Sequence, residues 1–321
     1  MRGYVLRRVA TSSGLLVLSS VLIFVVLRTI PGDPTIVALG GTPEGADPKA
    51  IAAIRHNLGL DQSVPDQYWH WIVGILHGNF GKSYFSGFPV TTLLAERAPA
   101  TIELAMMALV LGLLIAVPAA VLGAIWRNRH YDRALSGFTA IGMSTPSFIS
   151  GILLILLFGV KLHVLPIQGY VSIEDDPLES LKTTILPACA LALAIAAPII
   201  RLLRSSLADV SSASYMRTAQ GKGLRRHKIV LRHLLPNALI PSLTMVGVII
   251  GGLIGGSVIV EYVFARRGLG SLMINAVEQR DYQVLQALVL LAAATFILTS
   301  LITDLLYGVI DPRLRVQQRQ V

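Results

Sequence analysis

Charged residues are scarce in this chain of 321 residues. Asp, Glu, Lys and Arg make up 14% of the sequence against 54% for hydrophobic residues, and the mean hydropathy is +0.67. A soluble domain carries about 25% charged residues. Apolar blocks near the roughly 20 residues needed to cross a bilayer recur along the chain, so we expect a multi-span membrane protein.

Cysteine is almost absent as well. Cys189 stands alone inside an apolar run, where it can form no internal disulfide and no metal site by itself, and we interpret it as a packing residue. The seven histidines are scattered without metal-ligand spacing on one predicted element. No nucleophile, base and oxyanion-hole arrangement is visible in the sequence. We therefore expect no catalytic residues and no metal bound by this chain.

Carboxylates are missing from the centres of the apolar blocks, because Glu103, Glu261 and Asp304 all fall near predicted span ends. A carrier driven by protons needs ionisable side chains at membrane depth. The sequence also lacks the internal hydropathy repeats of a carrier and the polar cluster at one depth expected of a membrane enzyme. Both classes are disfavoured.

A complete phosphate-binding loop is also lacking. Gly81-Lys82-Ser83 matches the end of the pattern G-x-x-x-x-G-K-[ST], but the position that requires the first glycine is Leu76. We expect no cofactor bound by this chain, so any chemistry that uses ATP and Mg²⁺ must come from a partner.

Six apolar blocks are present, and they predict an all-α integral membrane protein with six transmembrane helices. Pro146 and Pro198 interrupt two of these blocks and predict kinks, and we regard Pro146 and Ser147 as candidate pathway-lining residues. The blocks lie at roughly 9–30, 101–126, 135–161, 184–203, 238–263 and 284–309.

The positive charge is unevenly distributed between the loops. With the N-terminus inside, the cytoplasmic pieces hold 17 of the 27 Lys and Arg residues, and most acids fall outside. This bias predicts cytoplasmic N- and C-termini. It also explains the net charge of +9 without nucleic acid, which we exclude as a partner.

Residues 31–98 are too polar to span a bilayer, and we interpret them as a small external helical subdomain between the first two spans. Asp47 and Pro48 suit the start of one short helix, and "VPDQYWHWIVGILHG" predicts a second, amphipathic one. Its rings Tyr68, Trp69 and Trp71 could form a partner surface, but we favour anchoring at the membrane interface.

A basic segment, "YMRTAQGKGLRRHKIVLRHLLPNALIP", follows the fourth block and is too long for a plain loop. It predicts a short helix, a turn at Gly221 and Gly223, and a second helix that leads through Pro236 into the fifth span. Such a bracket could dock into a groove on another protein or rest on anionic lipid. In the span itself, Gly251 and Gly255 belong to a stripe of small residues that favours close helix packing, and both are candidate pathway residues.

The spacing of Ala219, Gly223 and Leu235-Pro236 resembles the "EAA" loop of ABC-importer permeases. "RTAQGKGL" is particularly similar to the loop of the dipeptide, oligopeptide and nickel permease family, and "RTIPGDP", "APATIELA" and "DLLYGVIDPRLR" extend the likeness over nearly the whole chain. The sequence departs from the family pattern where Arg217 replaces glutamate and where Arg267 replaces proline in the outer turn before Gly268.

The resemblance implies a type I ABC importer transmembrane domain and the first permease subunit of a bacterial inner-membrane complex. Its expected partners are a second homologous permease in a heterodimer, two cytoplasmic ABC ATPases, an extracytoplasmic substrate-binding protein and the lipid bilayer. The implied cargo is di- or oligopeptides, with nickel or a nickel metallophore as the alternative.

The implied organisation has a first helix at 1–30, the external subdomain at 31–98, a core at 99–312 and a tail at 313–321. Within the core, the coupling loop at 204–236 would dock the ATPases. The residues expected to do so are Tyr215, Met216, Arg217, Thr218, Ala219, Gly223, Leu224, Leu235 and Pro236.

Overall fold

The computed structural model describes residues 2–29, 35, 48–57, 59–126, 128–212 and 225–310. Within them, five helices are long and apolar enough to cross a membrane, and a bent helix pair makes a sixth if it counts as one span. The all-helical class predicted from the apolar blocks is therefore confirmed. The five are α1 (Arg2–Thr29), α5 (Val90–Trp126), α8 (Pro177–Ser211), α11 (Leu235–Val263), entered from His227, and α13 (Tyr282–Ile310).

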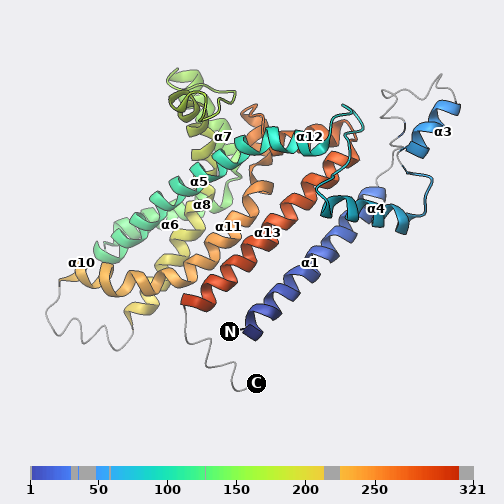
Figure 1. Cartoon of the computed structure of the whole chain (residues 1–321). Coiled ribbons are helices and arrows are strands. Elements are labelled where there is room, and N and C mark those ends of the chain that lie inside the picture. The colour runs from blue at the N-terminus through green and yellow to red at the C-terminus, as the bar shows by residue number, and fades with distance from the viewer. Residues whose placement is uncertain are drawn as a thin grey trace.

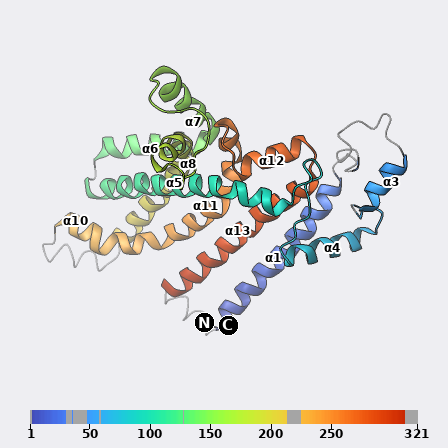
Figure 2. The same ribbon diagram turned by 45° about the horizontal axis from the view of Figure 1, so that its top comes forward.

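The centre of the bundle is formed by α5, α8 and α11, which lie against one another (Figures 1 and 2). Leu104 and Ala108 of α5 pack with Leu191 and Ile195 of α8 in its main apolar cluster, which Phe264 after α11 completes. Both α5 and α8 begin several residues before the predicted spans. Val90 in the first turn of α5 is fully buried, the Asp176 side chain caps the first turn of α8, and α8 continues through Pro198 without a break.

The third apolar block is sharply broken rather than gently kinked. Helix α6 (Arg129–Ser144) and α7 (Ser147–Leu154), which continues in a π-helical stretch to Lys161, are bent by 105° relative to each other. Pro146 lies at the break in an extended conformation with φ −58° and ψ 140°. Proline disfavours the helical conformation of the residue before it, which explains why the helix ends at this point.

Helix α1 lies at the edge of the bundle and contacts α13 (Figure 1). The Arg8 guanidinium is 2.9 Å from the Asp304 carboxylate of α13, and the Tyr4 hydroxyl donates to the Asp304 backbone oxygen. Most of the remaining surface of α1 is exposed in the chain alone, which leaves it available to lipid.

The segment between α1 and α5 contains the two predicted short helices, α3 (Pro48–Asn57) and α4 (Val64–Leu76). The side chain of Ser63 caps α4, while the expected cap Asp47 lies outside the described residues. Tyr68 and Trp71 of α4 pack with Phe24 of α1, with ring centroids 5.2 and 5.6 Å from the Phe24 ring. Two of the three rings considered as interface anchors therefore attach α4 to α1.

The two ends of the bundle are different in construction. We name the end that holds α4, the short α12 (Leu269–Glu278) and the start of α13 the insert end (Figure 1). We name the opposite end, with α10 (Arg226–Ile229), the start of α11 and the N-terminus, the bracket end.

Candidate functional site

Most of the predicted coupling residues lie outside the described residues: Tyr215, Met216, Arg217, Thr218, Ala219, Gly223 and Leu224. The described part of the bracket begins at Arg225 and runs through α10 and a π-helical turn, Val230–Leu234, into α11. Leu235 and Pro236 form the first turn of α11, as the proline pattern predicts, and Pro236 is exposed.

The second helical part of the bracket runs from Arg226 to Leu234, and we call it the arm. Apolar packing holds it against the bundle. Ile229, Val230 and Leu234 are 6%, 1% and 6% exposed. They form one cluster with Val121 near the end of α5 and Leu203 near the end of α8, among others. The arm is continuous with α11 through helical backbone. A displacement of the bracket would therefore act directly on α5, α8 and α11.

The four candidate pathway residues, two on α11 and two at the α6–α7 break, have different environments. Gly251 is buried against α13, where an added Cβ would lie 2.9 Å from Phe296 Cδ2, so it permits the close contact of these helices. Gly255 is exposed, and an added Cβ there would meet no atom within 4 Å. Pro146 is exposed at the α6–α7 break and Ser147 is half-buried. Lining of a passage by these residues stays a prediction.

A buried carboxylate at the insert end was not predicted. Glu261, near the end of α11, is fully buried. Its Oε2 accepts hydrogen bonds from the backbone N–H groups of Gly270 and Ser271 in the first turn of α12, at 2.8 and 3.2 Å. Its Oε1 accepts from the Thr101 hydroxyl of α5 at 2.7 Å, and this hydroxyl in turn accepts from the N–H of Leu269. Glu261 thereby joins α11 to α5 and caps α12.

Arg266 is fully buried beside it, in the turn between α11 and α12. Its Nε donates to the Ala100 backbone oxygen at 3.0 Å, its Nη1 to the Thr184 hydroxyl at 2.9 Å, and its Nη2 lies 3.4 Å from a Glu103 oxygen. Its guanidinium also lies over the Tyr170 ring, 4.6 Å from the centroid. Burial lowers the pKa of Arg266, and the Glu103 carboxylate opposes this shift. One side chain thus connects α5, α8 and the loop before α8.

The same turn explains why an arginine, Arg267, can stand where the family pattern has proline. Its side chain is exposed, while Gly268 is so close to Glu261 that a Cβ would overlap the carboxylate. The shape of the turn therefore depends on Glu261, Arg266 and Gly268, and the proline position tolerates an arginine because it faces outward.

A second polar connection attaches the segment between α1 and α5, which we call the insert, to the bundle. Asp281, between α12 and α13, is 2% exposed and accepts hydrogen bonds from the Ser83 hydroxyl and from the N–H groups of Tyr84 and Phe85 at 3.2 and 3.4 Å. Ser83 belongs to the Gly81-Lys82-Ser83 tripeptide that resembled part of a nucleotide loop. Here it attaches residues 79–90 to the start of α13.

Comparison with known proteins decides the family. Residues 92–316 match the family described as binding-protein-dependent transport system inner membrane component, and residues 1–105 match the N-terminal family of the same transport systems. The chain belongs to this permease family. The resemblance inferred from the coupling-loop motif and the flanking motifs is confirmed.

Named relatives of this permease cover almost its full length. It is 39% identical over 97% of its length to a probable peptide ABC transporter permease, y4tP, of Sinorhizobium fredii, covering 99% of that protein. It is 41% identical over 98% of its length to the glutathione transport system permease GsiC of Escherichia coli, also covering 99% of that protein. The permease is thus a membrane component of a bacterial ABC importer that works with a binding protein, and it is not itself an enzyme.

The fold has solved counterparts. An inward-facing structure of the MetNI methionine ABC transporter matches with a TM-score of 0.57 at 19% identity, covering 68% of this permease and 96% of that chain. A second crystal form matches with a TM-score of 0.53. The type I importer fold expected from the resemblance is confirmed. Membership of the family implies ATPase subunits and a binding protein as partners.

Proposed function

We propose that this permease forms one half of the translocation passage for di- or oligopeptides, including small peptides such as glutathione. The observation that supports this most strongly is the 39–41% identity, over 97–98% of its length, to permeases named for peptide and glutathione transport. The other half is a second homologous permease, and two ATPases and a substrate-binding protein complete the complex. Nickel or a nickel metallophore is the alternative cargo, and no contact among the described residues favours it.

The proposed role of the bracket is to couple ATP hydrolysis to movement of the spans. Residues 213–224 dock on an ATPase, and the arm from Arg226 to Leu234 transmits its displacement. The burial of Val230 and Leu234 against α5 and α8 supports this role, because a packed apolar arm transmits a push to its neighbours. In this arrangement the bracket end and both termini are cytoplasmic, and the insert end faces the binding protein.

Uptake by the reconstituted complex tests the cargo. With ATP at the bracket side and the binding protein at the insert side, we expect ATP-dependent uptake of a labelled dipeptide or of glutathione. Uptake of Ni²⁺ without any peptide uptake would contradict the proposal and favour the metal alternative.

Two bracket variants test the coupling. Gly223→Leu should leave the permease inserted but abolish substrate-stimulated ATP hydrolysis, because a docked interface accommodates added volume poorly. Arg226→Ala should have a milder effect. If the bracket only rested on anionic lipid, the order would be reversed, because each cation contributes about 1 kcal/mol there and an added leucine would help.

Single-cysteine labelling tests the orientation. In a Cys189→Ser background, a cysteine at position 60 should react with a membrane-impermeant reagent added from outside the cell. Labelling at this position only from the cytoplasmic side would overturn the assigned topology.

A further inference from the structure

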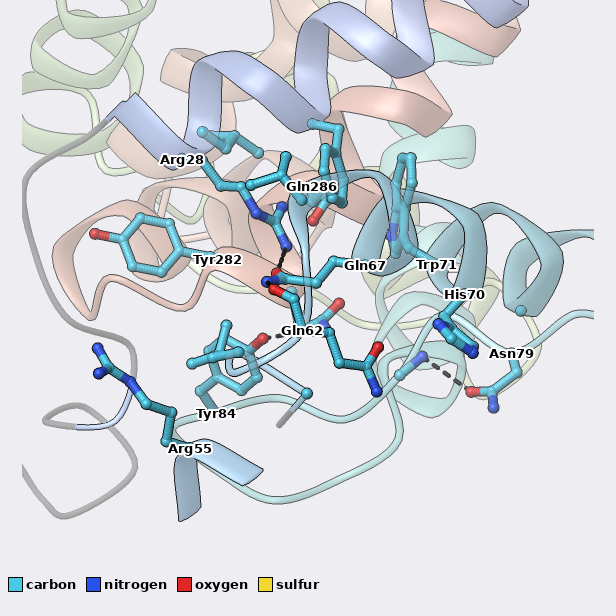
Figure 3. Close-up of a pocket in the computed structure, with 18 residues that line it drawn as sticks. Arg28, Arg55, Gln62, Gln67, His70, Trp71, Asn79, Tyr84, Tyr282 and Gln286 are labelled. Carbon is cyan, nitrogen blue, oxygen red and sulfur yellow. Dashed lines mark hydrogen bonds between the residues drawn. The ribbon is translucent and has the colours of Figure 1, made fainter. Parts of the chain in front are cut away.

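A pocket with a mixed polar and apolar lining lies at the insert end. It has a volume of about 730 Å³ and lies between the end of α1, the insert with α4, and the start of α13 (Figure 3). This size is within the range of sites for small organic ligands. Neither the proposed passage nor the bracket uses it.

The charge of the pocket selects an anion. The described residues that line it include two arginines, Arg28 and Arg55, and one histidine, His70, but no Asp or Glu. Figure 3 shows Arg28 directed from α1 toward Gln67 of α4, to which it donates a hydrogen bond. The Arg28 guanidinium also stacks 3.6 Å from the centroid of the Phe24 ring. These contacts orient a cation without neutralising it.

The wall from α13 carries polar atoms with no partner. Within the described part of the chain, Tyr282 Oη, Gln283 Oε1 and Gln286 Nε2 are buried and make no hydrogen bond. Gln286 is 5% exposed, and all three residues line the pocket. A buried polar group without a partner costs free energy, so such groups commonly mark a bound molecule.

These unpaired atoms restrict the ligand further. The Gln286 amide nitrogen needs an acceptor and Gln283 Oε1 needs a donor, which a peptide group supplies as C=O and N–H. The oxygens of a phosphodiester could accept from Gln286 but carry no hydrogen to donate to Gln283. Phe24, Leu27 and Trp71 add apolar surface to the same pocket, which suits a side chain next to the polar groups.

We propose that this pocket binds a small peptide with a free carboxylate, with the carboxylate at Arg28 and a peptide group facing Gln283 and Gln286. This inference rests on the proposed peptide cargo and adds to it a second, accessory binding site at the insert end. It also predicts a preference for peptides with an acidic or uncapped C-terminal group, because Arg28 pairs with a carboxylate. No described lining residue carries a carboxylate that could pair with a free amine.

Calorimetric titration of the assembled complex without its binding protein tests the site. The probes are Ala-Phe, its C-terminal amide, and a short-chain phosphatidylglycerol. We expect Ala-Phe to bind, and its amide to bind about tenfold more weakly or worse, since the charge-assisted hydrogen bond is lost. Equal binding of the amide, or binding of the lipid without binding of the peptide, would overturn the proposal.

Matched variants locate the binding. Gln286→Leu and Arg28→Gln should each weaken Ala-Phe binding about tenfold or more. Gln279→Leu and Arg267→Gln change the same residue types at exposed positions outside the pocket and should leave binding unchanged. Basal ATP hydrolysis and the melting temperature serve as checks of folding. Unchanged binding in both pocket variants would refute the site.

Peptide uptake by the same preparation separates the two proposals. If the wild-type complex imports peptide but shows no binding sensitive to Arg28 or Gln286, the pocket proposal is wrong and the proposed function stands. If peptide binds in the pocket and uptake is absent despite intact assembly, the pocket proposal stands and the proposed cargo is wrong.

Discussion

The insert end and the bracket end of this permease are stabilised by different physical interactions. At the insert end, Glu261, Arg266 and Asp281 are at most 2% exposed, and each is hydrogen-bonded to residues far away in the sequence. At the bracket end, the buried side chains of the arm, such as Val230 and Leu234, are apolar. The charged contacts there, between Arg204 and Asp132 and between Arg8 and Asp304, are partly exposed.

This difference suits different mechanical roles. A buried charge needs its hydrogen-bond partners in one geometry, so polar clusters fix the elements they join. Apolar contacts are non-directional and tolerate small sliding movements. We infer that α5, α11 and α12 are held in fixed positions at the insert end. At the bracket end, the last turns of α5 and α8 can move with the bracket.

The largest expected effect comes from removing the carboxylate at the centre of the insert end. Glu261→Ala leaves the N–H groups of Gly270 and Ser271 and the Thr101 hydroxyl without their acceptor. We expect a loss of about 3–5 kcal/mol in the free energy of unfolding, measured by denaturation in detergent.

Glu278→Ala, at an exposed position on α12, is the control and should change little. Glu261→Gln keeps the size of the side chain and one acceptor oxygen, so its effect should lie between the two. If the free energy of unfolding of Glu261→Ala lies within about 1 kcal/mol of wild type, water replaces the carboxylate. Buried polar contacts would then not be what holds the insert end together.

The second prediction concerns the attachment of the insert. Asp281→Ala removes the acceptor for Ser83, Tyr84 and Phe85, and we expect a cost of about 2–3 kcal/mol, confined to residues 79–90. Hydrogen exchange at the Tyr84 and Phe85 amides should accelerate, while the amides of α8 stay protected. Asp175→Ala, at an exposed position, is the control. Faster exchange throughout α8 would show that the insert end is one cooperative unit.

The sequence allowed the spans to be predicted because each is a local apolar block of membrane length. It also located α3 from Pro48 in its first turn and α4 from its amphipathic pattern, and Pro146 predicted a kink where the structure has a 105° bend. The polar contacts were not predictable in this way, because Ser83 and Asp281 are 198 residues apart and Thr101 and Glu261 are 160 apart. Glu261 fell near a span end in the sequence, and burial became evident only when α5 and α12 were in place.

The third prediction addresses the apolar arm. Val230→Ala should lower the free energy of unfolding by only about 1–2 kcal/mol, yet reduce substrate-stimulated ATP hydrolysis severalfold, because the arm loses contact with α5 and α8. Leu231→Ala, at a position that is 51% exposed, is the matched control and should leave coupling intact. An equal loss of coupling in both variants would show that packing of the arm does not transmit the movement.

The smallest expected effect comes from a charged pair that lies in the insert but is exposed. His56 Nδ1 is 2.6 Å from the Asp61 carboxylate, and this hydrogen bond raises the pKa of His56 and lowers the pKa of Asp61. A raised histidine pKa stabilises the fold below its unfolded value of about 6.5 and the gain is lost as pH rises through the folded pKa. The lowered aspartate pKa acts above about 3.9, so the pair contributes between these two values.

Because both side chains are exposed, water screens this pair and its contribution should be close to zero even in that window. We expect His56→Ala and wild type to show the same melting temperature from pH 5 to pH 8, within measurement error. A destabilisation of His56→Ala at pH 5 that disappears at pH 8, comparable in size to that of Asp281→Ala, would break the comparison. It would show that charge pairing, rather than burial of hydrogen-bonded charges, stabilises the insert end.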